Sequence, residues 1–422
     1  MTNEFKYLMY LFACGANGTN PNPPNYKIDW DQLISLADNQ AIGTIVAYAL
    51  KRSDLNSCSN ELKDKIVSNL LSAAINSCMK KKLILKLLHC FELEGIHAVV
   101  LKGFAVAECY AAPECRISGD TDIYIDIGNE LRAYELLRNY GFTVTPRTPK
   151  AHHAVCFHPQ MGCLELHVIL YDEIVEDIWF NGLNDLSSTL EQNDLVTTED
   201  GTYYTLGKTD HLIFLALHMI KHFIISGMSL RMMMDTALFI KHNKSELDMN
   251  RFWLTLNKLK YTDLMNTLFG AMIQYCEFTA DDFPGMSSFE PQNVAMVLDD
   301  LETGGWLGFN NKVAREDGWV EYNRQKMIMQ KGALHYKAYM FCWSSAIYWR
   351  AIFPKRDTLA LRYPYVNKHI LLVPYAWCHR LIVRGIKRLF AGRINPYFIS
   401  QNTQLSDSGK ARMKMFRDLG MI

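Results

Sequence analysis

The sequence predicts an α+β protein, in which a small mixed β-sheet core is flanked by helical regions along the chain. Apolar residues recur at helical spacing over residues 1–95 and again over residues 181–349, whereas short alternating runs fill residues 96–180. A basic region, residues 350–422, completes the chain. With 422 residues, of which 49% are hydrophobic, the chain is long enough for two or three packed domains.

A polar break rich in Pro and Asn, residues 17–26, divides the N-terminal helical region. The run IDWDQLISLADNQAIGTIVAYAL follows, with apolar residues at helical spacing and Asp29 or Asp31 as its N-cap. One or two further helices are expected over residues 61–94, where the pattern ends at Gly95.

The predicted core, residues 96–180, combines short strands and helices. The run IHAVVLKG predicts a strand that leads into the short helix FAVAECYA, and TDIYIDI predicts an alternating strand. A helix over residues 129–140 precedes the strand FTVTP. The runs HHAVCFH and CLELHVILY are then expected to form a hairpin around a Gly-containing turn.

Residues 209–280 return to helical periodicity, as in DHLIFLALHMIKHFI and LRMMMDTALFIKH. The remainder to residue 349 is expected to be helical, with polar breaks near residues 281–291 and 303–311. Residues 181–349 are therefore expected to form a helical domain that borders the core.

The C-terminal end is strongly basic. From residue 350 onward, 14 Lys and Arg residues stand against three Asp residues, so this end carries +11 and residues 1–349 carry −11. Residues 375–390 predict an amphipathic helix with a basic side formed by Arg380, Arg384, Lys387 and Arg388. Three interpretations stay open for this helix: docking on the acidic body, peripheral contact with an anionic membrane surface, and binding of an anionic acceptor.

Two carboxylates, Asp120 and Asp122, lie on one face of the strand in GDTDIYID, because side chains alternate between the faces of a strand. They repel each other unless a cation lies between them, and carboxylate oxygens suit Mg²⁺ or Mn²⁺. Glu165 lies in the apolar strand CLELHVIL with the same parity as His167, where a lone charge is costly. Three carboxylates on adjacent strands could hold two metal ions.

A phosphate-binding turn is expected where the strand VVLKG meets the following helix. Gly103 lets backbone amides approach a phosphate at the helix N-terminus. Lys102 supplies a positive charge there, and Arg116 could add a fork-shaped one. The structural alternatives are that Lys102 caps a strand end in solvent and that Arg116 pairs with Asp120.

Further polar residues leave alternatives open. His218 and His222 have the spacing of zinc ligands on a helix, but they could equally be structural or line a cleft. Arg231 and Asp235 lie four residues apart, so they could pair locally. His153 precedes a strand and could approach the cleft.

Taken together, LKG, a short helix, the pattern R-x-x-x-D-x-D and the later ELH resemble the DNA polymerase β-type nucleotidyltransferase superfamily. More narrowly, they resemble the bacterial family of uncharacterised nucleotidyltransferases. The stretches IDWDQLISLA, HMIKH, RMMMD and RYPYVNKHILLVPYAWCHR are also similar to that family, so the resemblance covers most of the chain.

The resemblance implies a nucleotidyltransferase-type core and a metal-dependent enzyme that transfers a nucleoside monophosphate (NMP) from a nucleoside triphosphate (NTP) such as ATP to an unidentified acceptor. It implies that Asp120, Asp122 and Glu165 are the catalytic residues and bind Mg²⁺ or Mn²⁺, and that Glu165 can help to deprotonate the acceptor. The nucleotide and cofactor contacts are then expected from Lys102, Gly103, Arg116, His167, Arg231 and Asp235.

One position departs from the wider superfamily, in which Gly-Ser or Gly-Gly is usual. Here Gly103 is followed by Phe104, so the triphosphate is expected to rely on Lys102, backbone amides or Arg116. This departure favours an alternative hypothesis, a catalytically weak or inactive, antitoxin-like interaction protein that keeps the fold and binds nucleotide. A third hypothesis is a hydrolase that uses the same carboxylates on water.

A cytoplasmic location is expected. No two of the 11 cysteines have a CxxC spacing. Scattered cysteines of this kind are typical of reduced, mostly buried thiols. The N-terminus reads as an amphipathic helix and not as a secretion signal, because Glu4 interrupts the charged start and bulky Phe12 precedes Cys14. No run of 18 uncharged apolar residues predicts a transmembrane helix. The acceptor could be a small hydroxylated molecule, a protein side chain or an RNA end.

Overall fold

The structure is a computed structural model that describes residues 1–52, 60–148, 151–170, 193–304, 312–334, 365–379 and 406–422, and the single residues 336, 353, 356 and 363. The chain divides into two compact units. Unit 1 comprises Met1–Tyr322 and Asp407–Ile422, and unit 2 comprises Asn323–Ser406. The described candidate site residues all belong to unit 1.

The N-terminal region is helical, as predicted. It forms α1 (Asn3–Asn17), α2 (Trp30–Asn39), α3 (Gly43–Lys51) and α4 (Asn60–Leu93). Asp29 caps α2, because its side chain accepts a hydrogen bond from the backbone amide of Gln32. Residues 60–93 form one helix of 34 residues, which ends just before Gly95.

A mixed sheet of seven strands follows, in the order β3-β4-β5-β2-β1-β7-β6. The strands are β1 (Ala98–Val100), β2 (Asp120–Ile125), β3 (Thr143–Thr145), β4 (His153–His158), β5 (Gly162–His167), β6 (Asn193–Thr198) and β7 (Gly201–Leu206). Strand β2 pairs in parallel with β5 and antiparallel with β1. The short segments between them are α5 (Phe104–Ala107), η1 (Pro113–Cys115), η2 (Ile127–Asn129) and α6 (Glu130–Asn139).

Strands β6 and β7 extend the sheet beyond the predicted core. They lie in a part of the chain that was expected to belong to the helical domain, and β7 pairs in parallel with β1. The signal is present in the sequence, since NDLVTT and GTYYTL flank the tight turn Glu199-Asp200. Gly201 has a φ of 144°, a conformation that favours glycine.

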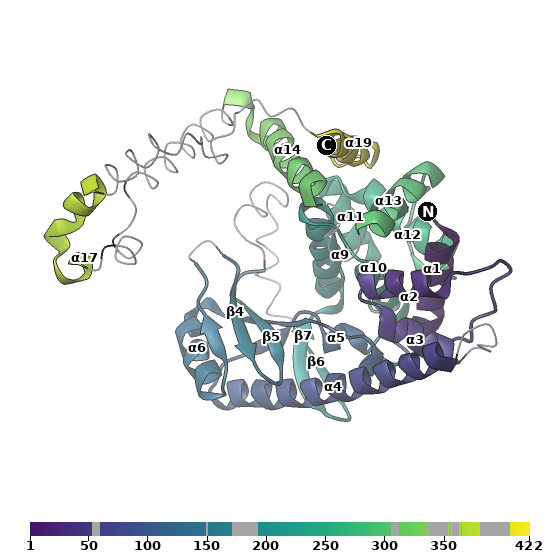
Figure 1. Ribbon diagram of the computed structural model, residues 1–422, viewed down its shortest axis with the longest axis horizontal. Coiled ribbons are helices and arrows are strands. Elements are labelled where there is room, and N and C mark those ends of the chain that lie inside the picture. The colour runs from purple at the N-terminus through teal and green to yellow at the C-terminus, as the bar shows by residue number, and fades with distance from the viewer. Residues whose placement is uncertain are drawn as a thin grey trace. The chain divides into compact units, whose positions relative to one another are not determined.

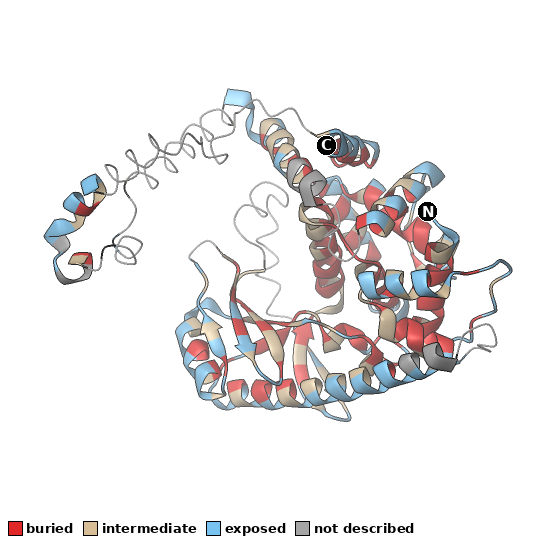
Figure 2. Cartoon of the chain, viewed as in Figure 1, coloured by how far each residue is buried: buried red, intermediate tan, exposed pale blue. Residues whose placement is uncertain are grey.

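The main core lies between the sheet and helices α4 and α6. Ile123 and Ile125 of β2 pack there with Leu164 and Leu166 of β5 and with residues of α4 such as Phe91. Figure 1 shows α4 running along the sheet, and Figure 2 shows its outward side mostly exposed. Because apolar side chains occupy this face, the polar side chains that alternate with them lie on the opposite face.

Unit 1 continues with helices gathered beside the sheet (Figure 1). They are α9 (Lys208–Ile225), α10 (Leu230–Asn243), α11 (Met249–Leu259), α12 (Thr262–Tyr275), η3 (Ala280–Asp282), α13 (Pro291–Gly304) and α14 (Lys312–Lys331), which runs on into unit 2. The last helix, α19 (Asp407–Asp418), returns to unit 1, where Arg412 Nη1 lies 2.8 Å from Asp300 Oδ1 of α13.

The described part of unit 2 holds α17 (Tyr365–Lys368) and η5 (Ile370–Leu372), with Val366 and Ala376 buried together. Most of the predicted basic helix, including Arg380, Arg384, Lys387 and Arg388, lies outside the described residues. Among the helices that the structure does describe, none combines the length and the apolar character needed to cross a membrane.

Candidate active site

The centre of the candidate site is the buried carboxylate of Asp122 on β2, which is 1% exposed. Its Oδ1 lies 2.9 Å from Lys102 Nζ and 3.1 Å from His167 Nε2. Burial alone would raise the pKa of Asp122, but the charge of Lys102 and the hydrogen bond from His167 outweigh it and hold the pKa well below its usual value. Asp122 is therefore ionised at neutral pH.

The second oxygen of Asp122, Oδ2, is buried and has no hydrogen-bond partner among the described residues. A buried, ionised oxygen of this kind is costly unless it meets a donor or a cation. This orphaned oxygen is the clearest sign that the site is built to receive a further group.

Glu165 lies directly beside Asp122, because the parallel pairing of β2 and β5 places these two residues in register. Its Oε2 lies 3.6 Å from His167 Nε2 and 3.7 Å from His153 Nδ1. Burial raises the pKa of Glu165, but the close contact with His167 and the charge of nearby imidazoles lower it by more, so the net pKa lies below its usual value.

His167 joins the two carboxylates. Burial lowers its pKa, but its hydrogen bond to Asp122 and its close contact with the Glu165 carboxylate more than offset this effect, so the net pKa is raised. Nitrogen and oxygen atoms from Asp122, Glu165 and His167, one per residue, lie within 4.8 Å of one another. The two carboxylates suit Mg²⁺ or Mn²⁺ in their donor chemistry, and the orphaned Oδ2 supports this fit.

Asp120, one of the three predicted metal-binding carboxylates, lies on the same face of β2 but outside this close group. Its Oδ1 accepts a hydrogen bond of 3.2 Å from Ser118 Oγ. Asp120 instead lines a cavity of about 80 Å³ together with Lys102, His218 and Arg231. The structure therefore brings Asp122 and Glu165 together and places Asp120 at the adjoining cavity.

Lys102 faces this site and not solvent. Its ammonium group lies 2.9 Å from Asp122 Oδ1 and 3.0 Å from His218 Nε2 on α9. Burial lowers the pKa of Lys102, but the charges of Asp122 and Asp120 more than compensate, so it is raised. Burial first, and then the Lys102 charge, hold the pKa of His218 well below its usual value, so a neutral His218 accepts this hydrogen bond.

His222 lies one turn from His218 on α9, with ring centroids 4.5 Å apart. Burial and then Lys102 lower its pKa to about 3. Among the described residues, neither imidazole belongs to a group of three potential metal ligands. Both histidines line the same small cavity as Lys102, so the structure favours the cleft-lining interpretation of the three that the sequence left open.

Arg116 is buried and pairs with Asp235 of α10, not with Asp120. Its Nε lies 2.7 Å from Asp235 Oδ1 and its Nη2 lies 2.5 Å from Oδ2, while Nη1 donates to the carbonyl of Gly103. The hydroxyl of Tyr110 also donates to Asp235 Oδ1, at 2.7 Å. This network ties α10 to the turn at Gly103.

Arg231, also on α10, donates to the carbonyl of Ile117 at 2.5 Å. Its buried Nε has no hydrogen-bond partner among the described residues. Burial and the nearby charge of Arg116 lower its pKa. Because Arg231 also lines the small cavity, it offers an unsatisfied donor beside that space.

Gly103 has a φ of 76°, which residues with a side chain rarely adopt. Glycine is therefore needed at this position for the backbone to take this conformation. Helix α5, which follows it, has only four residues. The ring of Phe104 packs edge-on against Tyr203 at 4.8 Å and joins the core under the sheet. Phe104 is therefore a packing residue.

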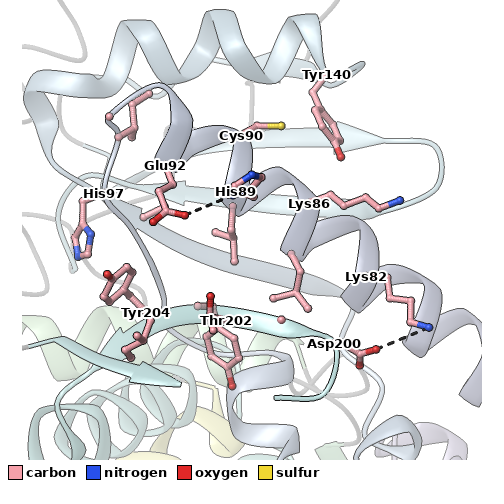
Figure 3. Close-up of a pocket in the computed structure, with 18 of the residues that line it drawn as sticks. Lys82, Lys86, His89, Cys90, Glu92, His97, Tyr140, Asp200, Thr202 and Tyr204 are labelled. Carbon is pink, nitrogen blue, oxygen red and sulfur yellow. Dashed lines mark ion pairs between the residues drawn. The ribbon is translucent and has the colours of Figure 1, made fainter. Parts of the chain in front are cut away.

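A much larger open groove lies elsewhere, between α4 and the strands β6 and β7. It has a volume of about 1140 Å³, and Lys82, His89 and Tyr204 are among the residues that line it (Figure 3). It contains none of the carboxylates predicted for catalysis. A second groove, of about 920 Å³, borders Gly103 and Arg116 beside α4. Chemistry, not size, makes Asp122 the centre of the candidate site.

Three neighbouring side chains were not among the predicted site residues. His152 and Lys221 lie 3.2 Å apart beside the cluster, and Tyr110 completes the Asp235 network. His153, whose approach to the cleft was one open alternative, lies next to Glu165. The alternating strand pattern of HHAVCFH could have indicated this position. In the antiparallel pairing of β4 and β5, His153 lies opposite His167.

The fold and site define an α+β protein whose mixed sheet carries an acidic and imidazole-rich cluster on the face opposite the main core. Over residues 26–271, more than half of the chain, the sequence matches the family model described as uncharacterised nucleotidyltransferase, and the chain belongs to that family. No curated protein and no solved structure matches the chain. The family membership indicates a transferase of the nucleotidyltransferase type.

Proposed function

We propose that this chain is a metal-dependent nucleotidyltransferase that transfers an NMP from an NTP to an acceptor hydroxyl. The observation that carries the proposal is the ionised Asp122, whose buried Oδ2 has no partner among the described residues and which lies in register with Glu165. Family membership over residues 26–271 supports the same reaction class.

Asp122 and Glu165, with Asp120 beside them, would hold Mg²⁺ or Mn²⁺. These ions, when bound, neutralise charge on the phosphates and stabilise the attacking and leaving oxygens. In the structure, the ammonium group of Lys102 forms an ion pair with Oδ1 of Asp122. Because a cation at Asp122 would repel the Lys102 ammonium group, we propose that Lys102 turns into the small cavity and contacts the triphosphate.

The small cavity supplies the remaining phosphate contacts in this proposal. Lys102, Ser118 and Arg231 line it, and Arg231 has an unsatisfied buried donor there. Each guanidinium nitrogen of Arg116 already has a hydrogen-bond partner, either Asp235 or the carbonyl of Gly103. In this proposal Arg116 therefore positions the turn and α10. The packing role of Phe104 explains why the triphosphate would depend on these charged groups and not on a serine hydroxyl.

In the proposed reaction, the acceptor oxygen attacks the α-phosphorus, the bond to the bridging oxygen breaks, and pyrophosphate leaves. Glu165 accepts the proton of the acceptor hydroxyl. Its lowered pKa keeps it ionised at neutral pH and therefore able to accept a proton. Positioning and charge stabilisation supply most of the rate enhancement in such reactions.

A second candidate is a catalytically weak, antitoxin-like protein that retains the fold and binds nucleotide. Phe104 favours it, because its ring is committed to the core and provides no hydroxyl for the triphosphate. The two candidates differ in product formation. A thermal shift with NTP and Mg²⁺ without any transferred NMP would support the second candidate.

The test is to incubate the full chain with each NTP, Mg²⁺ and cell extract and to search for NMP adducts by mass spectrometry. Asp122→Asn and Glu165→Gln should abolish the adduct while the protein stays folded. Asp126→Asn is the matched control, because Asp126 is exposed and its oxygen caps the turn at Gly128. A wild-type level of adduct from Asp122→Asn would contradict the proposal.

A further inference from the structure

Three histidines gather beside the candidate active site, and none of them lines the small cavity. His153 begins β4 and lies opposite His167 of β5, and His152 precedes His153. The pairing continues past β4, because the backbone amide of Val168 donates to the carbonyl of His152. The backbone thus fixes all three imidazoles on neighbouring strands.

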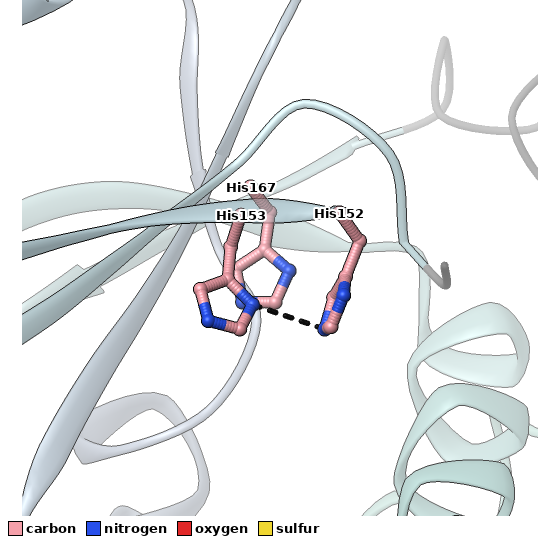
Figure 4. Close-up of side chains that lie close together, drawn as sticks. All are labelled: His152, His153 and His167. Carbon is pink, nitrogen blue, oxygen red and sulfur yellow. Dashed lines mark hydrogen bonds between the residues drawn. The ribbon is translucent and has the colours of Figure 1, made fainter. Parts of the chain in front are cut away.

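The three rings converge (Figure 4). Their centroids lie 4.3 Å apart for His152 and His153, 5.2 Å for His152 and His167, and 5.1 Å for His153 and His167. One ring nitrogen from each of the three residues lies within 4.8 Å of the other two. This spacing allows three nitrogens to reach a single ion after small side-chain rotations.

The hydrogen bonds show which nitrogens carry lone pairs. Lys221 Nζ lies 3.2 Å from His152 Nε2, and an ammonium group can only donate, so His152 Nε2 carries a lone pair. His153 Nδ1 lies 3.0 Å from the same nitrogen and donates to it, so a metal ion at His152 Nε2 would displace both donors. His167 Nε2 lies between the carboxylates of Asp122 and Glu165, so it donates there. Its Nδ1 is buried without a partner among the described residues.

Charge and burial also favour a cation in this position. The Lys221 ammonium group already lies against His152 Nε2, where a metal ion could replace it. Glu165 Oε2 lies within 3.7 Å of nitrogens on both His153 and His167 and supplies negative charge. Carboxylates that orient metal-binding imidazoles in this way are a common feature of metal sites.

We propose that His152, His153 and His167 bind a divalent transition-metal ion of the Zn²⁺ type, separate from the Mg²⁺ or Mn²⁺ of the proposed transferase site. Three imidazole nitrogens select zinc and its neighbours in the transition series, whereas Mg²⁺ requires oxygen ligands. Glu165 lies between the two sites. This metal site does not depend on nucleotide transfer, so it can exist whether or not the chain is an enzyme.

The test uses the metal-depleted full chain titrated with Co²⁺, followed by visible absorption, with Zn²⁺ competition measured by calorimetry. We expect one equivalent of Co²⁺ to bind with ligand-field absorption, to be displaced by Zn²⁺ and to resist excess Mg²⁺. His152→Gln and His153→Gln should each weaken binding at least about tenfold. The matched control is His89→Gln, because His89 is exposed on α4.

A further variant is expected to strengthen metal binding, an effect that a folding defect would not produce. Lys221→Met removes a competing cation 3.2 Å from His152 Nε2, so it should strengthen Co²⁺ binding. No Co²⁺ binding by the wild-type chain, ready displacement by Mg²⁺, or unchanged affinity in both His152→Gln and His153→Gln would overturn the proposal. None of these readouts requires nucleotide transfer, so failure of the transferase proposal is measured separately.

Discussion

The ammonium group of Lys102 lies 2.9 Å from Oδ1 of Asp122, while Oδ2 of the same carboxylate is buried without a partner among the described residues. Lys102 thus pairs with one oxygen of a carboxylate that we propose as a metal ligand, and the other oxygen is left without a partner among the described residues. The ion pair keeps Asp122 ionised in a buried position, and it makes Lys102 and a bound cation competitors.

This competition predicts a gain and a loss from one substitution. Lys102→Met should strengthen Mn²⁺ binding to the nucleotide-free protein at least about fivefold, because it removes a nearby like charge. The same change should weaken NTP binding, because it removes a proposed phosphate contact. Electron paramagnetic resonance of free Mn²⁺ measures the first effect and calorimetry the second. Lys86→Met, on the exposed side of α4, serves as the control, and weaker Mn²⁺ binding by Lys102→Met would count against this competition.

The buried pair Arg116 and Asp235 should contribute strongly to stability. Both side chains are almost fully buried, and their two contacts are 2.7 and 2.5 Å long. Removing one partner leaves an uncompensated buried charge, so Arg116→Met or Asp235→Leu should lower the free energy of unfolding by about 3–5 kcal/mol. The double variant should be less destabilised than the two single effects combined. Urea denaturation measures all three, and full additivity would show that the pair is not coupled.

Backbone strain predicts a second stability effect, at Gly103. Its φ of 76° is unfavourable for any side chain, so Gly103→Ala should cost about 1–3 kcal/mol of unfolding free energy. Gly119→Ala is the matched control, because Gly119 has no positive φ and no described heavy atom within 4 Å of its Cβ position. Equal effects at the two glycines, in thermal or urea unfolding, would refute this explanation.

His211 predicts a pH dependence of stability. Burial is the main cause that lowers its pKa to about 4, and its Nε2 lies 2.8 Å from the carbonyl of Leu101. Between about pH 6.5 and pH 4 the unfolded chain binds a proton that folded His211 does not, so stability should fall as the pH falls through this range. The loss attributable to His211 is about 3 kcal/mol. Unfolding of His211→Asn across this range should show a flatter pH dependence, and an unchanged slope would exclude His211 as its source.

The sequence was sufficient for the α+β class and for the strand faces on which Asp122 and Glu165 lie, because strand alternation is visible without a structure. The parity of Asp122 and Glu165 was predicted from their runs, and the main core confirms that Ile123 and Ile125 face the other side. The predicted strand TDIYIDI extended to Ile127, but β2 ends at Ile125 and the side chain of Ile127 is exposed.

Partners that are distant in the sequence could not be predicted. Arg231 and Asp235 have a helical spacing that suggests a local pair, yet Asp235 binds Arg116, which lies 119 residues away. Likewise, the parallel register that places Asp122 beside Glu165 depends on the whole sheet, including β6 and β7 from beyond the predicted core. Composition and spacing describe one segment at a time, whereas these contacts depend on how segments pack together.

The most direct test of the central proposal compares NTPs labelled in the α-phosphate with NTPs labelled in the γ-phosphate. The full chain with Mg²⁺ and cell extract should transfer label to an acceptor from the α-position only. Asp122→Asn should lose this transfer, and Asp126→Asn should retain it. Transfer from the γ-position, release of free NMP without an adduct, or full activity of Asp122→Asn would contradict the proposed nucleotidyl transfer at Asp122.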